Sequence, residues 1–227
     1  MAKIAVIYHS VNGHTKAVAE CMAEGIRNIA GTNVHLLEIK GEDVVGGRWR
    51  NEEIIDMLRD ADALAFGCPT HMGGVSAVFT AFMEWGFYPW LNQEWKNRLA
   101  AGFTNSSSQS GDKLNTLTSL QVFASQMAMI WVPMGDFPGN NWSGGTRHDI
   151  NRLGSFMGLM TQSNTDQDAL EALTEADRIT AVRFGEHFAK VVRRWLGEEI
   201  YKPEKYSAAE WRAWDTDRVN RKITGQI

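Results

Sequence analysis

Short apolar runs alternate with segments of helical periodicity along most of the chain, and this alternation limits the folds open to it. The run at 63–67 is almost entirely apolar, as in a parallel strand that is buried on both faces of a sheet. A βαβ succession of this kind predicts a doubly wound α/β fold, and five strands suit the order 2-1-3-4-5. The expected strands are 3–8, 34–39, 63–67, 99–104 and 129–134, and the expected helices are 15–29, 51–59, 75–85, 113–125 and 174–196.

Size and composition exclude several classes of protein. The 227 residues suit one domain, expected at 1–196, and a polar extension, 197–227, whose Trp211 and Trp214 suggest packing on the domain or on a neighbouring subunit. A formal net charge of −4 argues against a nucleic-acid partner. No run approaches the roughly 18 apolar residues of a membrane span, and the start lacks the features of a signal peptide.

The two cysteines, Cys21 and Cys68, form neither a disulfide framework nor a zinc-binding pattern. This usage fits a reducing compartment, so we expect a cytoplasmic protein without a metal site.

Three turns share an unusual chemistry. They read "SVNGHT", "PTHMGG" and "TNSSSQSG", and they follow the first, third and fourth expected strands. All three are rich in small or hydroxyl-bearing residues and almost free of charge. In a parallel sheet with right-handed crossovers they open on the same edge, at the carboxyl ends of the strands, where ligands bind. We therefore expect the three loops to form one site.

The first loop predicts a phosphate cradle of an uncommon kind. It matches neither G-x-x-x-x-G-K-[ST] nor G-x-G-x-x-G, which argues against a nucleotide triphosphatase and a dinucleotide-binding enzyme. A phosphotyrosine-type phosphatase is excluded as well, because Cys68 has no Arg six places on and Cys21, which does have Arg27 there, lies within the first expected helix. A phospho-acceptor receiver is excluded because the third strand ends without an Asp. Ser10, Asn12 and Thr15, with the amides of a helix N-terminus, can hold a phosphate monoester without a lysine. The same side chains could instead simply cap the helix.

The second and third loops resemble walls for a flat ring, because Gly-, Ser- and Asn-rich backbone approaches a heterocycle edge closely. A monophosphate joined to a large planar heterocycle suggests FMN.

The three loops, taken in order as "SVNGHT", "GCPTHMGGV" and "FTNSSSQSGDKLNT", resemble those of the flavodoxin-like NAD(P)H-dependent FMN and quinone reductases, in particular the Trp-repressor-binding-protein-like flavoproteins. The similarity runs from about residue 3 to 196. It implies a flavodoxin-like fold, FMN as cofactor, NADH or NADPH as reductant, small-molecule acceptors such as a quinone or free flavin, and a homodimer or homotetramer.

The resemblance also implies the residues that hold FMN, one group for each loop. They are Ser10, Val11, Asn12, Gly13, His14 and Thr15; Pro69, Thr70, His71, Met72 and Gly73; and Asn105, Ser106, Ser107, Ser108, Gln109 and Ser110.

Two further positions are implied on the substrate side. Trp90 stands where family members place a Trp that reaches a neighbour's flavin site, and Gln126 stands where they have a His beside the flavin. The quinone reductases usually carry an Arg and an aromatic residue in place of His71 and Met72, so the departures concern the acceptor more than FMN.

No side chain is required as a nucleophile, because a flavin carries the redox chemistry itself. His71 is our candidate for orienting the acceptor, although a solvent-facing loop histidine is an equal alternative. Arg147 and His148 are weaker candidates for the site, and Cys68 is interpreted as packing. Two other functions stay open: a flavodoxin-type electron carrier, and a flavodoxin-like binding module without activity.

Overall fold

The computed structural model describes residues 1–197. Residues 198–227 lie outside the described part, and with them Trp211, Trp214 and the expected packing of the extension. The boundary between a domain at 1–196 and an extension therefore stays a prediction. Within the described residues, no helix is long and apolar enough to cross a membrane.

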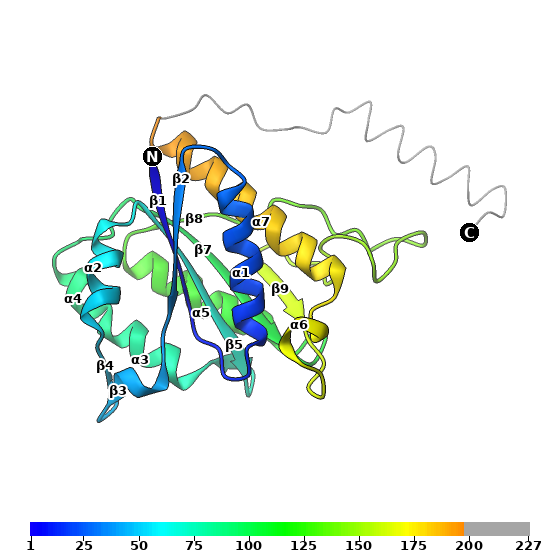
Figure 1. Cartoon of the computed structure of the whole chain (residues 1–227), viewed down its shortest axis with the longest axis horizontal. Coiled ribbons are helices and arrows are strands. Elements are labelled where there is room, and N and C mark those ends of the chain that lie inside the picture. Colours follow the sequence, from blue (N-terminus) through cyan, green and yellow to red (C-terminus); the bar gives the residue numbers. More distant parts are fainter. Residues whose placement is uncertain (198–227) are drawn as a thin grey trace.

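A central parallel sheet organises the fold (Figure 1). Its main path runs β2-β1-β5-β7-β8, which is the predicted order 2-1-3-4-5. The strands on this path are β1 (Ala2–Tyr8), β2 (Thr32–Glu38), β5 (Ala63–His71), β7 (Leu99–Ser106) and β8 (Ile130–Trp131). Off this path, β6 (Gly74–Val75) pairs antiparallel with β5, and β9 (Leu159–Gln162) pairs parallel with β7.

Helices cover both faces of the sheet, as predicted (Figure 1). One core lies under α1 (His14–Arg27) and α7 (Glu175–Trp195), and it contains Ile4 and Val6 of β1. The other contains Ala5 and Ile7, because successive strand side chains point to opposite faces. Its helices are α2 (Glu52–Asp60), α3 (Ala77–Trp85) and α5 (Lys113–Gln126).

Smaller elements connect these layers. They are the 3-10 turn η1 (Gly41–Asp43), the hairpin strands β3 (Val44–Val45) and β4 (Arg48–Trp49), and the short helices α4 (Phe87–Leu91) and α6 (Ala169–Ala172).

Helices α1 and α7 pack closely because each presents a glycine to the other. A Cβ on Gly25 would run into the carbonyl of Val182, and one on Gly185 would run into the carbonyl of Met22. The two backbones are therefore nearer than side chains between them would allow. This contact fixes the C-terminal half of α1 against α7.

The last strand of the sheet differs from the prediction. A strand was expected at 129–134, but β8 covers only Ile130–Trp131 and pairs with the start of β7. The chain then leaves the sheet over 132–158 and returns as β9, which pairs with Phe103–Ser106 at the end of β7. The edge of the sheet is thus made of two pieces, and the second piece brings its own following loop to the carboxyl edge.

The third strand also continues further than predicted. The expected strand ended at residue 67, but Pro69 faces Asn105 in the ladder, and β5 extends to His71. The Gly67 carbonyl accepts from His9 of the β1 segment, so the alternation of a strand turns the nitrogen of Pro69 to that same side. Because β1 pairs with β5 only as far as Gly67, the missing N–H of proline leaves no ladder bond unmade.

Candidate functional site

A cavity of about 230 Å³ opens at the carboxyl edge of the sheet, where all three predicted loops meet. The predicted residues in its wall are Ser10, Val11, Asn12, His14, Thr15, Pro69, Thr70, His71, Asn105, Ser106 and Ser107. The remaining residues predicted for FMN, which are Gly13, Met72, Gly73, Ser108, Gln109 and Ser110, belong to the same loops but are not in the wall. The convergence expected from the carboxyl-edge rule is therefore present in the structure.

The first loop ends at the N-terminus of α1, and no side chain among residues 1–197 caps that helix end. The N-cap is Gly13, in the left-handed region with φ 83°. The first turn holds no acidic residue. Ser10, Asn12 and Thr15 therefore do not act as helix caps, and that alternative is wrong. The free amides and the helix dipole favour an anion at this point.

Ser10 adds an independent observation. Its Oγ is buried and has no hydrogen-bond partner among the described residues. A buried hydroxyl without a partner is costly, and native structures rarely retain one without a ligand, ion or water to satisfy it. A phosphate monoester fits this cradle, because its oxygens accept from both the hydroxyl and the helix amides.

The second loop is a tight hairpin between β5 and β6. Thr70 pairs with Val75 and His71 with Gly74, so Met72 and Gly73 form a two-residue turn with φ of 47° and 76°. Two positive φ values are typical of the type I′ turn that suits the twist of a hairpin. The turn projects Met72 fully into solvent, whereas His71 is exposed at the cavity wall.

Hydroxyl groups fasten this hairpin to the sheet. The Oγ1 of Thr70 lies 2.8 Å from that of Thr104 and 2.8 Å from that of Thr116. Thr104 in turn donates to the carbonyl of Cys68 at 2.7 Å. All of these side chains are buried, so the base of the hairpin is rigidly placed beside the cavity.

The third loop begins later than predicted, because β7 continues through Asn105 to Ser106. Asn105 is buried, and its amide donates to Thr161 at 2.8 Å and to Ser163 at 3.0 Å. These bonds join the end of β7 to β9 and the residue after it. Asn105 therefore has a structural task as well as a place in the cavity wall.

The prediction missed a fourth segment of the wall. Ser163 and Thr165, which follow β9, also line the cavity. The same segment reaches the first loop, because the ring Nε2 of His14 lies 3.1 Å from the carbonyl oxygen of Gln167. A polar "QSNTDQ" stretch after an apolar pair, at 162–167, repeats the pattern of the other loops and could have indicated these residues.

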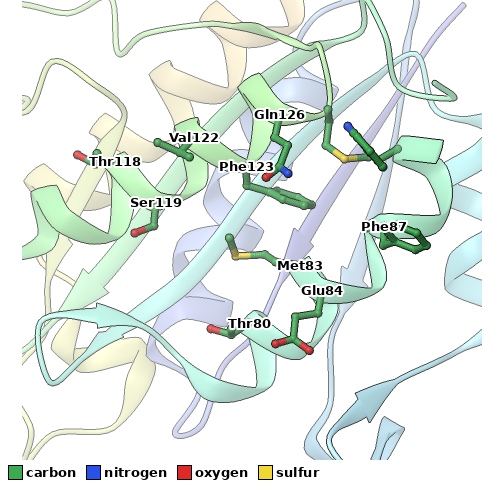
Figure 2. Close-up of a pocket in the computed structure, with 12 residues that line it drawn as sticks. Thr80, Met83, Glu84, Phe87, Thr118, Ser119, Val122, Phe123 and Gln126 are labelled. Carbon is green, nitrogen blue, oxygen red and sulfur yellow. The ribbon is translucent and has the colours of Figure 1, made fainter. Parts of the chain in front are cut away.

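A second, larger cavity of about 720 Å³ lies between α3, α4 and α5, and both predicted substrate residues line it. Figure 2 shows Phe123 and Gln126 of α5 facing Met83 of α3. Trp90 also lines this cavity. Helix α5 starts beside the third loop, and its 14 residues carry the chain about 20 Å away before Gln126. The structure therefore brings Trp90 and Gln126 together but not to the three loops.

The larger cavity lacks the chemistry of a phosphate site. Its wall is mainly apolar, and among the described residues that line it Glu84 is the one charged side chain, with no lysine or arginine. The smaller cavity at the carboxyl edge is therefore the better candidate for FMN, despite its size. A volume of 230 Å³ is below that of typical ligand pockets, so only part of a ligand as large as FMN would lie inside it.

The remaining candidates do not join the site. Arg147 donates to the ring of its neighbour His148 at 3.3 Å, and neither residue lines the cavity. Cys68 is fully buried in the core, where burial raises the pKa of its thiol to about 12, so the interpretation as packing is confirmed. Among residues 1–197, no group of His, Cys, Asp or Glu side chains has the arrangement of a metal site.

Known proteins resemble the chain over most of its length. The family model described as NADPH-dependent FMN reductase matches residues 2–144. Flavodoxin FldP of Pseudomonas aeruginosa is 36% identical over 192 residues, which are 84% of this chain and 97% of that protein. An NAD(P)H dehydrogenase (quinone) of Chromohalobacter salexigens is 27% identical over 87% of this chain and its own full length.

Solved structures agree with these relatives. A flavodoxin, WrbA-like protein from Agrobacterium tumefaciens superposes with a TM-score of 0.65 and 32% identity, over 86% of this chain and 99% of that one. The family match spans all three loops at the carboxyl edge. The chain therefore belongs to the NADPH-dependent FMN reductase family, and it is an NAD(P)H-dependent oxidoreductase that uses FMN.

Proposed function

We propose that the chain binds FMN at the carboxyl edge of the sheet and passes a hydride from NAD(P)H, by way of the flavin, to a quinone, free flavin or similar two-electron acceptor. Bound flavin supplies the redox chemistry by accepting two electrons and delivering them in a second step. The residues of the chain bind, orient and shield the reactants.

One observation carries the proposal: the amides at the start of α1 lack a side-chain cap, and the buried Ser10 hydroxyl beside them lacks a partner. In our proposal both hold the FMN phosphate. Asn12, Gly13, His14 and Thr15 contribute backbone N–H groups to the same anion. A dianionic phosphate here needs no lysine, because the helix dipole and aligned amides supply the positive potential.

The other two loops hold the ring in this proposal. The hairpin at Pro69–Gly73 lies under one side of the isoalloxazine, and Asn105–Ser110 lies along the pyrimidine edge. His71 is exposed at the cavity wall, so its ring is free to donate to or accept from an oxygen of the acceptor. Quinones and flavins both present such carbonyl oxygens, which makes His71 the side chain that we assign to acceptor orientation.

We also propose that the chain forms a homodimer or homotetramer through the groove between α3 and α5. Apolar side chains stay exposed along α4 and beside it, and monomeric proteins rarely leave such a cluster uncovered. They are Phe87, Tyr88, Trp90 and Leu91, with Val122 of α5. Because Trp90 and Gln126 are remote from the cavity of their own chain, a role for them in acceptor binding requires a second copy.

We propose a cytoplasmic location, supported by two free cysteines and by a nicotinamide reductant.

The test is a titration of the purified protein with FMN, followed by anaerobic addition of NADH or NADPH. The proposal requires saturable FMN binding and rapid bleaching of the bound flavin by at least one nicotinamide, with reoxidation by an added quinone. If the protein does not bind FMN even at high concentration, the proposal is wrong. The alternative that remains is then a binding module without activity.

A flavodoxin-type electron carrier is the second candidate, and the 36% identity to a protein named flavodoxin favours it. The same titration separates the two. A carrier binds FMN but is not reduced by NADH or NADPH at a useful rate, and it passes electrons to a protein partner one at a time.

A further inference from the structure

A buried lysine fastens the third loop of the cavity. Lys113 is the first residue of α5, and its side chain is 0% exposed. Its Nζ donates to the Oγ of Ser106 at 2.8 Å and to the carbonyl oxygen of Ser108 at 2.6 Å. The Ser106 hydroxyl also donates to that carbonyl, at 3.0 Å. The three groups form a closed triangle directly behind the cavity wall.

The backbone between these residues wraps around the ammonium group. The amide of Lys113 donates to the carbonyl of Ser110 at 3.1 Å, which closes a tight turn. Gly111 has φ 52°, and a Cβ at this position would collide with the Ser106 hydroxyl. The loop is therefore packed against the lysine and has no room for a bulkier alternative.

Burying an ammonium group costs free energy, so the groups around it must compensate for that cost. Here the ammonium donates both to the Ser106 hydroxyl and to the Ser108 carbonyl, which also accepts from Ser106, so it ties these two residues together. Charge-assisted bonds of this kind are about twice as strong as neutral ones. Ser106 and its neighbour Ser107 both line the cavity, so the lysine acts on the site without touching it.

We propose that Lys113 is the positioning residue of the third loop: its ammonium fixes Ser106 and Ser107 in the cavity wall before a ligand arrives. The consequence for ligand affinity rests on the proposed function, because the ligand is taken to be FMN. The effect of Lys113 on the order of the loop does not depend on the proposed function.

The charge on Lys113 makes the arrangement sensitive to alkaline pH. Burial lowers its pKa to about 8, while Asp177 of α7 raises the pKa and Arg152 of the 132–158 segment lowers it. These two groups pair with each other, so their effects on Lys113 largely offset. Below pH 8 the ammonium persists and the loop is held. As pH rises past 8 the proton is lost, the bonds weaken, and affinity for FMN falls.

The first experiment compares Lys113→Met with Lys96→Met in the apoprotein. Both changes remove one positive charge, but Lys96 is exposed, and its one side-chain bond within residues 1–197 is to Gln93 at 3.3 Å, in a different part of the fold. Amide hydrogen exchange over residues 106–111 is followed by mass spectrometry. We expect exchange at least tenfold faster in Lys113→Met and unchanged in Lys96→Met. Equal exchange in all three proteins overturns the proposal.

The second experiment measures the FMN dissociation constant between pH 7 and 9.5. The second ionisation of the phosphate, near pH 6, is complete over this range and does not interfere. We expect the wild-type constant to rise above pH 8, by at most tenfold per pH unit, and Lys113→Met to bind at least tenfold more weakly with a flat profile. A flat wild-type profile, or a Lys113→Met profile that matches the wild type, overturns the role of the charge.

The two readouts separate the two proposals. If the wild type does not bind FMN but residues 106–111 exchange faster in Lys113→Met, the proposed function falls and the positioning role stands. Should Lys113→Met fail to fold, Ser106→Ala removes one acceptor and keeps the lysine. It should also speed exchange over 106–111, and unchanged exchange there would count against the role of Lys113.

Discussion

The ring Nδ1 of His9 lies 2.8 Å from the hydroxyl oxygen of Ser76, and both side chains are buried. His9 follows β1 directly, at the root of the first loop, whereas Ser76 follows the hairpin of the second loop and precedes α3. The bond therefore ties two walls of the cavity together from below. It also explains why Ser76, although placed as the N-cap of α3, makes no capping bond with its side chain.

We expect protonation of His9 to destabilise the protein in mild acid. Burial lowers its pKa, and the charge of His71 lowers it further. His9 therefore binds a proton more readily in the unfolded chain than in the folded one. The stability that depends on neutral His9 is lost as pH falls below its unfolded pKa of about 6.5. We expect His9→Gln to reduce the difference in urea midpoint between pH 7.5 and 5.5, while the exposed His148→Gln leaves it unchanged. An equal acid dependence in His9→Gln and the wild type would contradict this.

Because the Arg152–Asp177 ion pair is buried, we expect the loss of one partner to destabilise the folded protein strongly. Its atoms are 2.7 Å apart, with side-chain exposures of 7% and 2%, and Asp177 also accepts from the amide of Gln162 in β9. Asp177→Asn leaves a buried guanidinium uncompensated, so we expect the free energy of unfolding to fall by about 3–5 kcal/mol. Urea unfolding at pH 7 measures it.

A matched control lies two residues earlier in the same helix. Glu175 pairs with Arg178 on the surface, and Glu175→Gln should change the unfolding free energy little, because solvent screens such a pair. Equal losses of unfolding free energy in Asp177→Asn and Glu175→Gln would show that burial does not determine how much the Arg152–Asp177 pair contributes.

The parts of this fold that could be predicted from sequence are those that depend on local pattern. Strands such as 63–67 are apolar throughout because they are buried on both faces, and a general rule places their following loops on one edge. Ser10 and His71 could be assigned to one site for that reason alone. The split of the last strand could not. Leu159–Gln162 is four residues long and half polar, and it pairs with residues more than fifty positions earlier.

Trp90 and Gln126 show a different limit. The resemblance places Trp90 at a neighbour's flavin site, so its role depends on how copies assemble, which the sequence pattern of one chain does not specify. In the described chain they line the groove between α3 and α5. The predicted end of the third strand at residue 67 was wrong for a third reason. Whether a proline such as Pro69 breaks a ladder depends on where the neighbouring strand ends.

Ser10→Ala separates binding from stability. Because the Ser10 hydroxyl is buried without a partner, its removal should leave the melting temperature of the apoprotein unchanged or slightly raised. A hydrogen bond to a charged group contributes about 1.5–3 kcal/mol, so FMN affinity should fall by roughly 10- to 100-fold. Riboflavin, which lacks the phosphate, should bind both proteins equally. Equal losses for FMN and riboflavin would place Ser10 elsewhere than at the phosphate, and the exposed Ser143→Ala serves as the control.

The aromatic face of α4 predicts that assembly depends on Trp90. Its side chain is 43% exposed, next to Phe87 at 55% and Leu91 at 64%, and its ring lies 5.8 Å from that of Phe87. A buried interface tryptophan typically contributes 2 kcal/mol or more, so Trp90→Ser should weaken the association at least about 30-fold. Sedimentation velocity over a range of micromolar concentrations measures this. Phe156→Ser, which removes an aromatic side chain of 63% exposure from another segment, is the matched control and should leave the oligomer intact. A wild-type protein that stays monomeric across that range would contradict the prediction, because the exposed face would then have no second copy to cover it.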